Sequence, residues 1–380
     1  MAGHKNTAGA DNAAVEAKKR QGCAILAGES DHIVAEAAAR IFADLADPQT
    51  INRDKDNAWK APLWRALEAA GLPLAWVPEA LGGSGASLAD GFAVLGAAGR
   101  CALAVPLAET LLAGWLLGRA GLDAPAGAMT IAPARPLDRI AMSADGMLNG
   151  RVIGVPFAAE AKYIAVLAEA AAGAVVALVE AADCRIDDGR NLAGDPANVV
   201  TISRVKPLRS AAAPAGLDAT ALMLMGATIR SVQTAGALET ALALSVGYAN
   251  ERIAFERPIG KFQAVQQNLA RLAGETAAAL AVSGSAADAL AEFDSIDDAA
   301  LLEAASAKIR CAEAATEGSA IAHQVFGAIG FTNEHVLHRF TLRMKAWRDD
   351  FGNESYWSNE LGRRVAQLGA DEFWPLVASR

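Results

Sequence analysis

Hydrophobic residues recur at helical spacing through most of the chain, and one stretch in the middle departs from this pattern. Apolar positions three and four residues apart predict amphipathic helices over residues 31–45 and 222–255. Between residues 129 and 206 the pattern changes to short β-branched runs, such as MTIAPA, KYIAVLAE and GAVVALVEA, separated by Gly, Asp and Asn. Runs of this kind predict the strands of a small antiparallel barrel or sandwich.

Turn and capping residues divide these regions into separate elements. A short helix over residues 62–70 should end at Gly71, and Ser87 followed by Asp90 is typical of a helix N-cap with its acidic partner. The sequence LNG before RVIGV predicts a tight turn between two strands. After a linker over residues 209–220, the helices expected in the C-terminal half are 222–255, 262–290, 296–322, 333–349 and 354–377.

The order of helices, strands and helices predicts an α+β fold with three structural units. Ahead of them, a tail rich in Ala, Gly, Lys and Asn is expected to be poorly ordered. The predicted boundaries are a flexible tail over 1–28, an N-terminal helical domain over 29–125, a middle β domain over 126–210 and a C-terminal long-helix bundle over 211–380.

Composition excludes several classes of protein. Hydrophobic residues make up 53% of the chain and aromatic residues only 6%, which favours closely packed helices. The formal net charge of −9 argues against sequence-independent binding of nucleic acid. The N-terminus has no continuous apolar segment, and charged residues interrupt the Ala-rich run over 158–182. We therefore expect a cytoplasmic protein without a membrane span.

No metal site is expected from the sequence. The four cysteines lie far apart and form no CxxC or mixed His/Cys spacing, which indicates reduced thiols. His335 and His338 are three residues apart, but no third ligand is placed beside them, so a surface or interface position is the better interpretation.

The sequence YANERIAFERPIGKFQAVQQ, over residues 248–267, contains the most informative candidate chemistry. Tyr248, Arg252 and Phe255 are four and three residues apart and share one helix face. A proline and a glycine then break the helix, and Gln263 begins a group of amide side chains on the next. A cation, an aromatic ring and amides around a turn can bind a planar ligand that bears phosphate.

This segment resembles the acyl-CoA dehydrogenase family of flavoproteins, and two other segments share the resemblance. They are HQVFGAIGFTNEHVLHR over residues 323–339 and AGLPLAWVPEALGGSGASLADGFAVLGAAGR over residues 70–100, and all three occur in the family's order. The resemblance implies a helical domain, a β domain and a helical bundle, with FAD between the last two. It also implies an oligomer in which one subunit contacts the FAD of its neighbour. The residues that match the family's FAD contacts are Arg252, Phe255, Gln263, Gln324, Gly327 and Gly330.

The family's reaction removes two hydrogens from an acyl-CoA thioester and passes the electrons to an electron-transfer flavoprotein. A carboxylate takes the α-proton while the β-hydride moves to the flavin. The family usually has this Glu in a YEGT-like motif, but here Phe351 occupies its position. Of the nearby acids, Asp350 is the first candidate for the base and Glu354 the second. Alternatively, these acids simply begin the final helix, where negative charge is favourable.

These departures leave other functions open. Glu256 stands where the family commonly has Gly, and MLMGATIR, the other place where the family can carry its base, contains no acid. Some short members of the family function as pairs of two different subunits, in which one subunit lacks the base. The second interpretation is therefore a non-catalytic or FAD-sharing partner subunit of a heteromeric acyl-CoA dehydrogenase. The third is a flavin oxidase or monooxygenase on the same fold. Each interpretation implies a homo- or hetero-oligomer.

Overall fold

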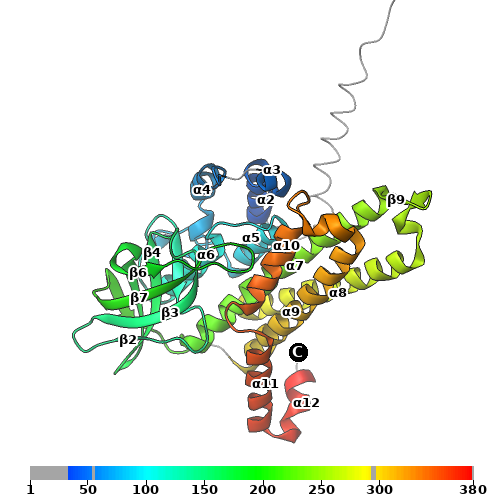
Figure 1. The fold of residues 1–380 in the computed structure, drawn as a ribbon. Helices are drawn as coiled ribbons and strands as arrows, with labels where there is room; N and C mark the ends of the chain where they lie inside the picture. Colours follow the sequence, from blue (N-terminus) through cyan, green and yellow to red (C-terminus); the bar gives the residue numbers. More distant parts are fainter. Residues whose placement is uncertain (1–32, 54–55, 292–296, 379–380) are drawn as a thin grey trace, which may run out of the picture.

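A computed structural model of the chain describes residues 33–53, 56–291 and 297–378. It consists of an N-terminal helical part, a central sheet and a C-terminal bundle of long helices, so the predicted fold class is confirmed (Figure 1). The tail predicted over residues 1–28 lies outside the described residues.

The N-terminal part consists of short helices that pack around a core of leucine, alanine and tryptophan side chains. Gly71, with φ of 69°, follows the helix over residues 60–69, and the Ser87 hydroxyl accepts a hydrogen bond from the amide of Asp90, so both predicted helix boundaries are confirmed. The elements are α2 (Ile33–Leu45), α3 (Pro48–Arg53), α4 (Lys60–Ala69), η1 (Leu72–Leu74), η2 (Glu79–Leu81), α5 (Leu88–Arg100) and α6 (Leu107–Arg119).

The middle part is an eight-stranded sheet with strand order β6-β7-β3-β2-β4-β5-β8, and β1 pairs with β4 outside this order. The strands are β1 (Met129–Ala132), β2 (Ile140–Met142), β3 (Leu148–Pro156), β4 (Tyr163–Ala170), β5 (Gly173–Glu180), β6 (Arg185–Asp187), β7 (Ala197–Val205) and β8 (Arg209–Ala212). A short helix, η3 (Ala181–Asp183), connects β5 to β6.

Three details of the predicted sheet are wrong. The sheet is mixed, because β1 runs parallel to β4. The predicted linker over 209–220 begins with β8, which completes the sheet beside β5. The sequence LNG lies inside β3, and the turn comes earlier, at Gly146 with φ of 77°, where the Ser143 hydroxyl donates to Asp145. Strand pairing and turn position depend on neighbouring strands, which local sequence patterns do not contain.

The C-terminal part is a bundle in which α7, α8 and α9 run beside one another along most of their length (Figure 1). Its elements are α7 (Ala219–Glu251), β9 (Ile253–Ala254), β10 (Arg257–Pro258), η4 (Ile259–Lys261), α8 (Gln263–Ala291), α9 (Asp298–Phe326), η5 (Gly327–Phe331), α10 (Leu337–Asp349), α11 (Glu354–Leu368) and α12 (Ala370–Ala378).

Two predicted helices in this part end too late. Helix α7 stops at Glu251, because Arg252 has an extended backbone, and Phe255 and Glu256, with φ of 50° and 65°, form the turn between β9 and β10. The predicted helix over 354–377 is divided into α11 and α12 at Gly369, which has φ of 88°. In both cases the backbone leaves the helical conformation where the apolar spacing continues.

Close packing of α5 against α7 joins the N-terminal helices to the bundle. A Cβ atom built on Gly236 of α7 would lie 2.3 Å from the carbonyl oxygen of Gly96, and one on Gly99 would lie 2.2 Å from the carbonyl oxygen of Gln233. The helix backbones therefore touch directly, and only glycine fits at these positions.

We predict opposite effects for two glycine substitutions within α7. Gly236→Ala should lower stability by about 1–3 kcal/mol, because the added methyl group overpacks the contact with α5. Gly247→Ala should raise stability by about 0.5–1 kcal/mol, because no atom lies within 4 Å of the new Cβ and Ala is the better helix former. Melting temperatures of parent and variants test this. Equal shifts in both variants would contradict the direct contact between α5 and α7.

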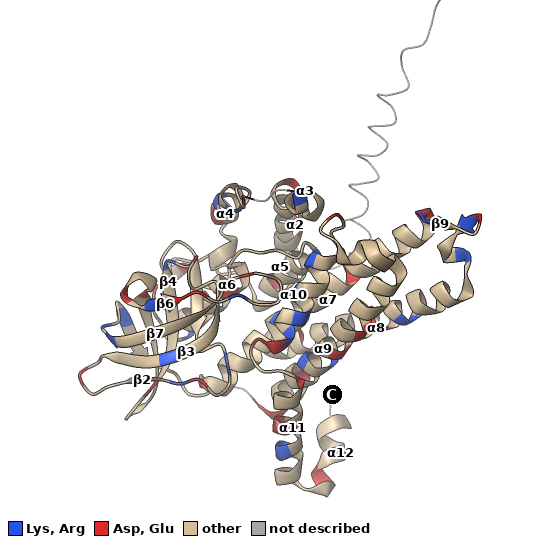
Figure 2. Ribbon diagram, in the orientation of Figure 1, with Lys and Arg blue, Asp and Glu red and all other residues tan. Residues whose placement is uncertain are grey.

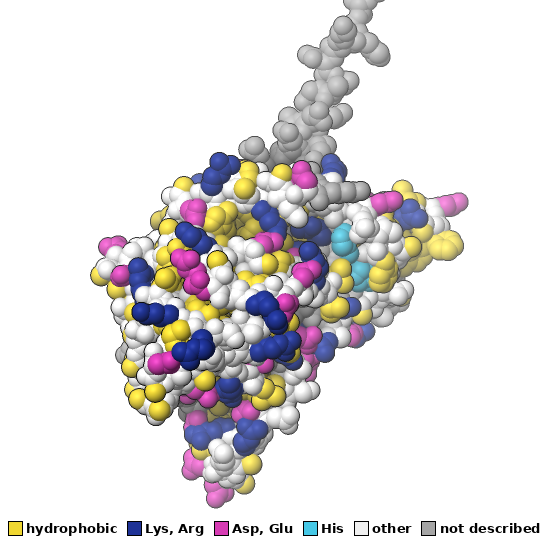
Figure 3. Space-filling model, turned by 60° about the vertical axis from the view of Figure 1, so that its left-hand side comes forward, with side chains coloured by type: hydrophobic (Ala, Val, Ile, Leu, Met, Phe, Trp, Pro, Cys, Tyr) yellow, Lys and Arg dark blue, Asp and Glu magenta, His cyan; other side chains and the backbone are white. Residues whose placement is uncertain are grey.

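The described residues contain no helix that combines the length and the apolar character required to cross a membrane. Basic and acidic residues alternate over the ribbon without segregating into regions of one sign (Figure 2). The face in Figure 3 shows the same mixture, with the histidine side chains gathered at one place.

Candidate functional site

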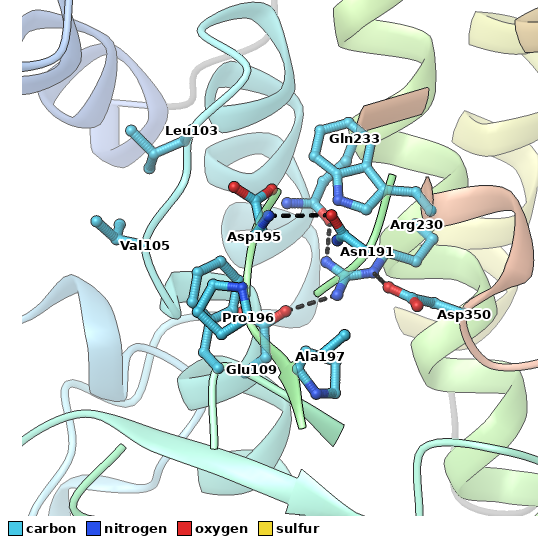
Figure 4. A pocket seen from close by; sticks show the side chains of 13 residues that line it. Leu103, Val105, Glu109, Asn191, Asp195, Pro196, Ala197, Arg230, Gln233 and Asp350 are labelled. Atoms are coloured by element: carbon cyan, nitrogen blue, oxygen red, sulfur yellow. Dashed lines mark hydrogen bonds and ion pairs between the residues drawn. The ribbon is translucent and has the colours of Figure 1, made fainter. Parts of the chain in front are cut away.

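A small polar pocket lies where the sheet, helix α6 and the bundle meet (Figure 4). Glu109 comes from α6, Arg230 and Gln233 from α7, and Asp350 from the loop after α10. The end of β3 and the loop before β7 close the remaining sides. The other lining residues are Leu103, Val105, Pro156, Phe157, Asn191, Asp195, Pro196, Ala197 and Trp347.

Arg230 connects three parts of the pocket wall. One terminal nitrogen donates to Oε1 of Glu109 at 2.6 Å, the Nε donates to Oδ2 of Asp350 at 2.9 Å, and the other terminal nitrogen donates to Oε1 of Gln233 at 2.7 Å. Figure 4 shows the guanidinium between these acceptors. Arg230 and Glu109 are 3% and 2% exposed, so their ion pair is held away from water.

Burial dominates the electrostatics of this cluster. Burial raises the pKa of Glu109 above its usual range, although the ion pair with Arg230 opposes the shift. Burial would lower the pKa of Arg230, but the two carboxylates outweigh it and the pKa is raised. Removing ions from water costs several kcal/mol each, so the cluster is stable only as a matched set of charges and hydrogen bonds.

The loop that carries Asp350 is fixed on several sides. Lys308 of α9, 2% exposed, donates to the backbone carbonyl oxygens of Trp347 and Asp350, the latter at 2.7 Å. The next residue, Phe351, has φ of 54°, and its ring would lie 2.3 Å from a Cβ on Gly226 of α7. These contacts leave the Asp350 carboxylate in the pocket, with Oδ2 bound to Arg230 and no described residue donating to Oδ1.

The second predicted base, Glu354, does not reach the pocket. It is the first residue of α11 and forms an ion pair with Nε of Arg348 at 2.8 Å in a separate surface groove. Asn353 caps the same helix, since its side chain accepts from the amide of Tyr356. The position of Glu354 therefore agrees with the alternative interpretation, an acid at a helix N-terminus. Asp350 is the predicted base that lines the pocket.

The six predicted FAD contacts come from the residues after α7, the start of α8, the end of α9 and η5, and none of them lines the pocket. The rings of Tyr248 on α7 and Phe326 on α9 stack at 4.4 Å and join the end of α7 to the end of α9. Phe255 at the turn is 88% exposed. Arg252, Gln263, Gln324 and Gly327 are also exposed, whereas Gly330 is buried.

Two of these positions differ in the space around them. A Cβ on Gly330 would lie 2.9 Å from Cβ of Phe326 and 3.1 Å from Nδ1 of His323, so a side chain there would need its neighbours to move. No atom lies within 4 Å of a Cβ on Gly327, but its φ of 63° still favours glycine. The close packing at Gly330 explains its glycine without a ligand.

Comparison with known proteins identifies the family. The family model of the acyl-CoA dehydrogenase C-terminal domain matches residues 216–365, and that of the N-terminal domain matches residues 28–125. The acyl-CoA dehydrogenase IpdE2 of Mycobacterium tuberculosis is 30% identical over 319 residues, which cover 83% of this chain and 91% of that protein. This chain belongs to the acyl-CoA dehydrogenase family.

Other relatives agree with this assignment. The acyl-CoA dehydrogenase FadE27 of Mycobacterium tuberculosis is 31% identical over 351 residues, covering 81% of this chain and 89% of that protein. The crystal structure of the ChsE4-ChsE5 complex from Mycobacterium tuberculosis matches with a TM-score of 0.80 at 25% identity, covering 91% of this chain and 99% of the matched chain. Acyl-CoA dehydrogenases are oxidoreductases that act on the CH–CH group of acyl-CoA thioesters, and this chain has the sequence and fold of that family.

The sequence interpretation missed the charged residues that surround Asp350. Glu109 lies in LAETLLAGWLLG and Arg230 follows MLMGATI, both otherwise apolar helical stretches. A single charge on an otherwise apolar helix face could have identified both residues, because a buried charge needs a partner from another element. The partner itself could not be predicted, since Glu109 and Arg230 are 121 residues apart.

The residues at the outer end of the bundle fit a flavin better than the residues of the pocket around Asp350 do. At the outer end of the bundle, no described residue forms a hydrogen bond or ion pair with the guanidinium of Arg252, and the exposed ring of Phe255 lies close by in sequence. The ring of Phe255 packs edge-on against that of Phe262, with centroids 6.1 Å apart. The guanidinium of Arg252, which no described residue binds, is therefore the feature here that suits a phosphate-bearing group. Inside the pocket, the Arg230 ion pairs occupy the space beside Asp350. Among the described residues, no group of three His, Cys, Asp or Glu residues could hold a metal.

We predict a specific pH dependence from Lys308. Burial lowers its pKa from 10.5 to about 8, so between these values the unfolded chain binds more protons than the folded chain. The free energy of unfolding should therefore rise with pH in this window, by at most about 1.4 kcal/mol per pH unit. Urea unfolding of parent and Lys308→Met at pH 8 and pH 10 isolates the effect. A difference between the two proteins that does not change with pH would contradict it.

Proposed function

We propose that the protein carries out FAD-dependent α,β-dehydrogenation of an acyl-CoA thioester and passes the electrons to an electron-transfer flavoprotein. The observation that supports this proposal is the position of Asp350. Its carboxylate lines the pocket between the sheet and the bundle, while the other acids near the end of α10 face elsewhere. FAD would accept the hydride, and the residues of this chain would position the thioester and remove the proton.

In this proposal Asp350 acts as the base through Oδ1. Because Arg230 binds Oδ2 and Lys308 fixes the backbone carbonyl, the carboxylate has one defined orientation, which favours proton transfer from a positioned substrate. Phe351, at the position of the family's Glu, has no basic atom that could accept a proton, and its ring fills the space against Gly226. Gln233 and Asn191 supply amide groups on the opposite wall.

For the cofactor, we propose that this chain contacts the FAD of a neighbouring subunit through Arg252, Phe255, Gln263, Gln324 and Gly327. Their common exposure at one end of the bundle supports a site completed by another chain. The protein would therefore be a homo- or hetero-oligomer. The ChsE4-ChsE5 structure is a complex of two named components, and this supports a hetero-oligomer for the present chain.

We also propose that the protein is cytoplasmic.

The second candidate function is a partner subunit that lacks its own active site. The observation that favours it is the occupation of the pocket by Arg230, whose ion pairs tie up Glu109 and one oxygen of Asp350. A carboxylate bound to a guanidinium is a weaker proton acceptor than a free one. In this case Arg252 and Phe255 would still contribute to the cofactor site of the other subunit. The third interpretation, an oxidase or monooxygenase, has no specific support among the described residues.

We predict that Asp350→Asn abolishes flavin bleaching by acyl-CoA thioesters, whereas Glu354→Gln leaves it nearly unchanged. The reason is that the amide cannot accept the α-proton, which should slow the reaction by at least about a hundredfold. The measurement is the visible absorbance of FAD-reconstituted protein after mixing with thioesters of different acyl size.

The outcomes separate the two functions. Equal bleaching in parent and Asp350→Asn would remove Asp350 from the reaction. If the parent bleaches with a thioester only after addition of a second dehydrogenase subunit, and the mixed complex that contains Asp350→Asn bleaches equally, the partner-subunit function replaces the first proposal. Arg252→Ala should then reduce the FAD content of the mixed complex more than it reduces the melting temperature.

A further inference from the structure

Two arginines of α10, Arg339 and Arg343, lie near the loop between β6 and β7, and one carboxylate of that loop, Asp195, binds Arg343. Arg343 donates from a terminal nitrogen to Oδ1 of Asp195 at 2.6 Å and from the other to the carbonyl oxygen of Arg339 at 3.2 Å. Arg343 and Asp195 are 4% and 8% exposed, so this ion pair is almost completely buried. Arg339 lies one helical turn before Arg343 on the same face of α10.

Arg339 has no partner of this kind. No described residue forms a hydrogen bond or an ion pair with its guanidinium, and its Nε is buried without an acceptor. The Nε of Arg343 is also buried without an acceptor. Burial, and next the charge of Arg343, lower the pKa of Arg339 to about 10, while Asp195 opposes this. Buried donors are normally satisfied, so two such atoms on adjacent guanidiniums indicate a missing acceptor.

The two arginines are connected to the candidate active site through Asp195. Asp195 lines the pocket, and it is labelled on the pocket wall in Figure 4. Arg339 is only half-buried, so its terminal nitrogens are not sealed from solvent. The two guanidiniums and one carboxylate leave one positive charge in excess beside the pocket. A guanidinium presents a planar fork of donors that matches a carboxylate or a phosphate.

We propose that Arg339 and Arg343 form a subsite for an anionic oxygen group on a ligand that occupies the pocket. This inference rests on the proposed function for the nature of the ligand, which would be an acyl-CoA thioester. The anion then has two possible sources, a phosphate of the CoA moiety or a carboxylate on the acyl group. Arg339 would bind the anion directly, and Arg343, held by Asp195, would add a second positive charge behind it.

The test measures binding of CoA, pentanoyl-CoA and glutaryl-CoA by titration calorimetry. Pentanoyl-CoA and glutaryl-CoA have acyl chains of equal length, and only the second ends in a carboxylate. The variants are Arg339→Gln, Arg339→Lys and, as the matched control, Lys345→Gln, which removes one positive charge from an exposed position of the same helix. A second measurement compares the melting temperature of each protein in inorganic phosphate and in sodium chloride of equal ionic strength.

Arg339→Gln should weaken anion binding by about tenfold or more, Arg339→Lys should keep only part of the parent's affinity, and Lys345→Gln should stay within about twofold of the parent.

Equal weakening for all three CoA compounds assigns the anion to a CoA phosphate. Weakening confined to glutaryl-CoA assigns it to an acyl carboxylate. Because no described residue binds the guanidinium of Arg339, the melting temperature of Arg339→Gln in chloride should not fall, as it would for a purely structural arginine.

The inference is overturned if Arg339→Gln binds all three compounds and phosphate as the parent does, or if Lys345→Gln loses as much affinity. It is also overturned if Arg339→Gln changes only the oligomeric state, since Arg339 would then pair with another subunit. If the parent binds no CoA compound but gains stability from phosphate in a way that depends on Arg339, the proposed function fails and the anion subsite remains.

Discussion

The buried ion pairs of Arg230 connect the parts of this structure on which its function depends. Glu109 comes from the N-terminal helices, Arg230 from the longest helix of the bundle, and Asp350 from the loop after α10. Each carboxylate is costly to bury without the guanidinium, and the guanidinium is costly to bury without the carboxylates, so all three depend on the ion pairs of Arg230. The same contacts position the candidate base and limit the space beside it. Stability and chemistry at this pocket therefore cannot be changed independently.

The two halves of the predicted site have different physical characters. The pocket around Asp350 is lined by Glu109 and Arg230, and the Arg230 guanidinium is bound to Glu109 and to one oxygen of Asp350, as expected for a preorganised site or for one that has been closed. The outer end of the bundle presents the guanidinium of Arg252, which no described residue binds, and the exposed ring of Phe255, whose edge packs against Phe262, as expected for a surface that another chain covers. An oligomer would satisfy both requirements if it brought this end of one chain to the cofactor of another.

The sequence predicted the helices well and the contacts between elements poorly. Apolar spacing is a local property, so the long helices and their order were recovered to within a few residues. The parallel pairing of β1 with β4, the addition of β8 and the position of the turn at Gly146 depend on partners distant in sequence. Asp350 was chosen as the candidate base because the family has its base at this point in the chain, and that role stays a prediction. Arg230, Glu109 and Lys308 were missed, because only the fold shows that their isolated charges meet at one place.

The central claim is that Arg230, Glu109 and Asp350 act as one interdependent charged unit, and a mutant cycle on folding stability tests it most directly. Unfolding in urea would be measured for the parent, for Arg230→Met, and for Arg230→Met combined with Glu109→Gln and Asp350→Asn. We expect Arg230→Met alone to lose about 3–5 kcal/mol, because it leaves two carboxylates without their cation. The triple variant should recover most of this loss. If the triple variant is less stable than Arg230→Met, so that the losses simply add, the three residues do not form a unit and the account is wrong.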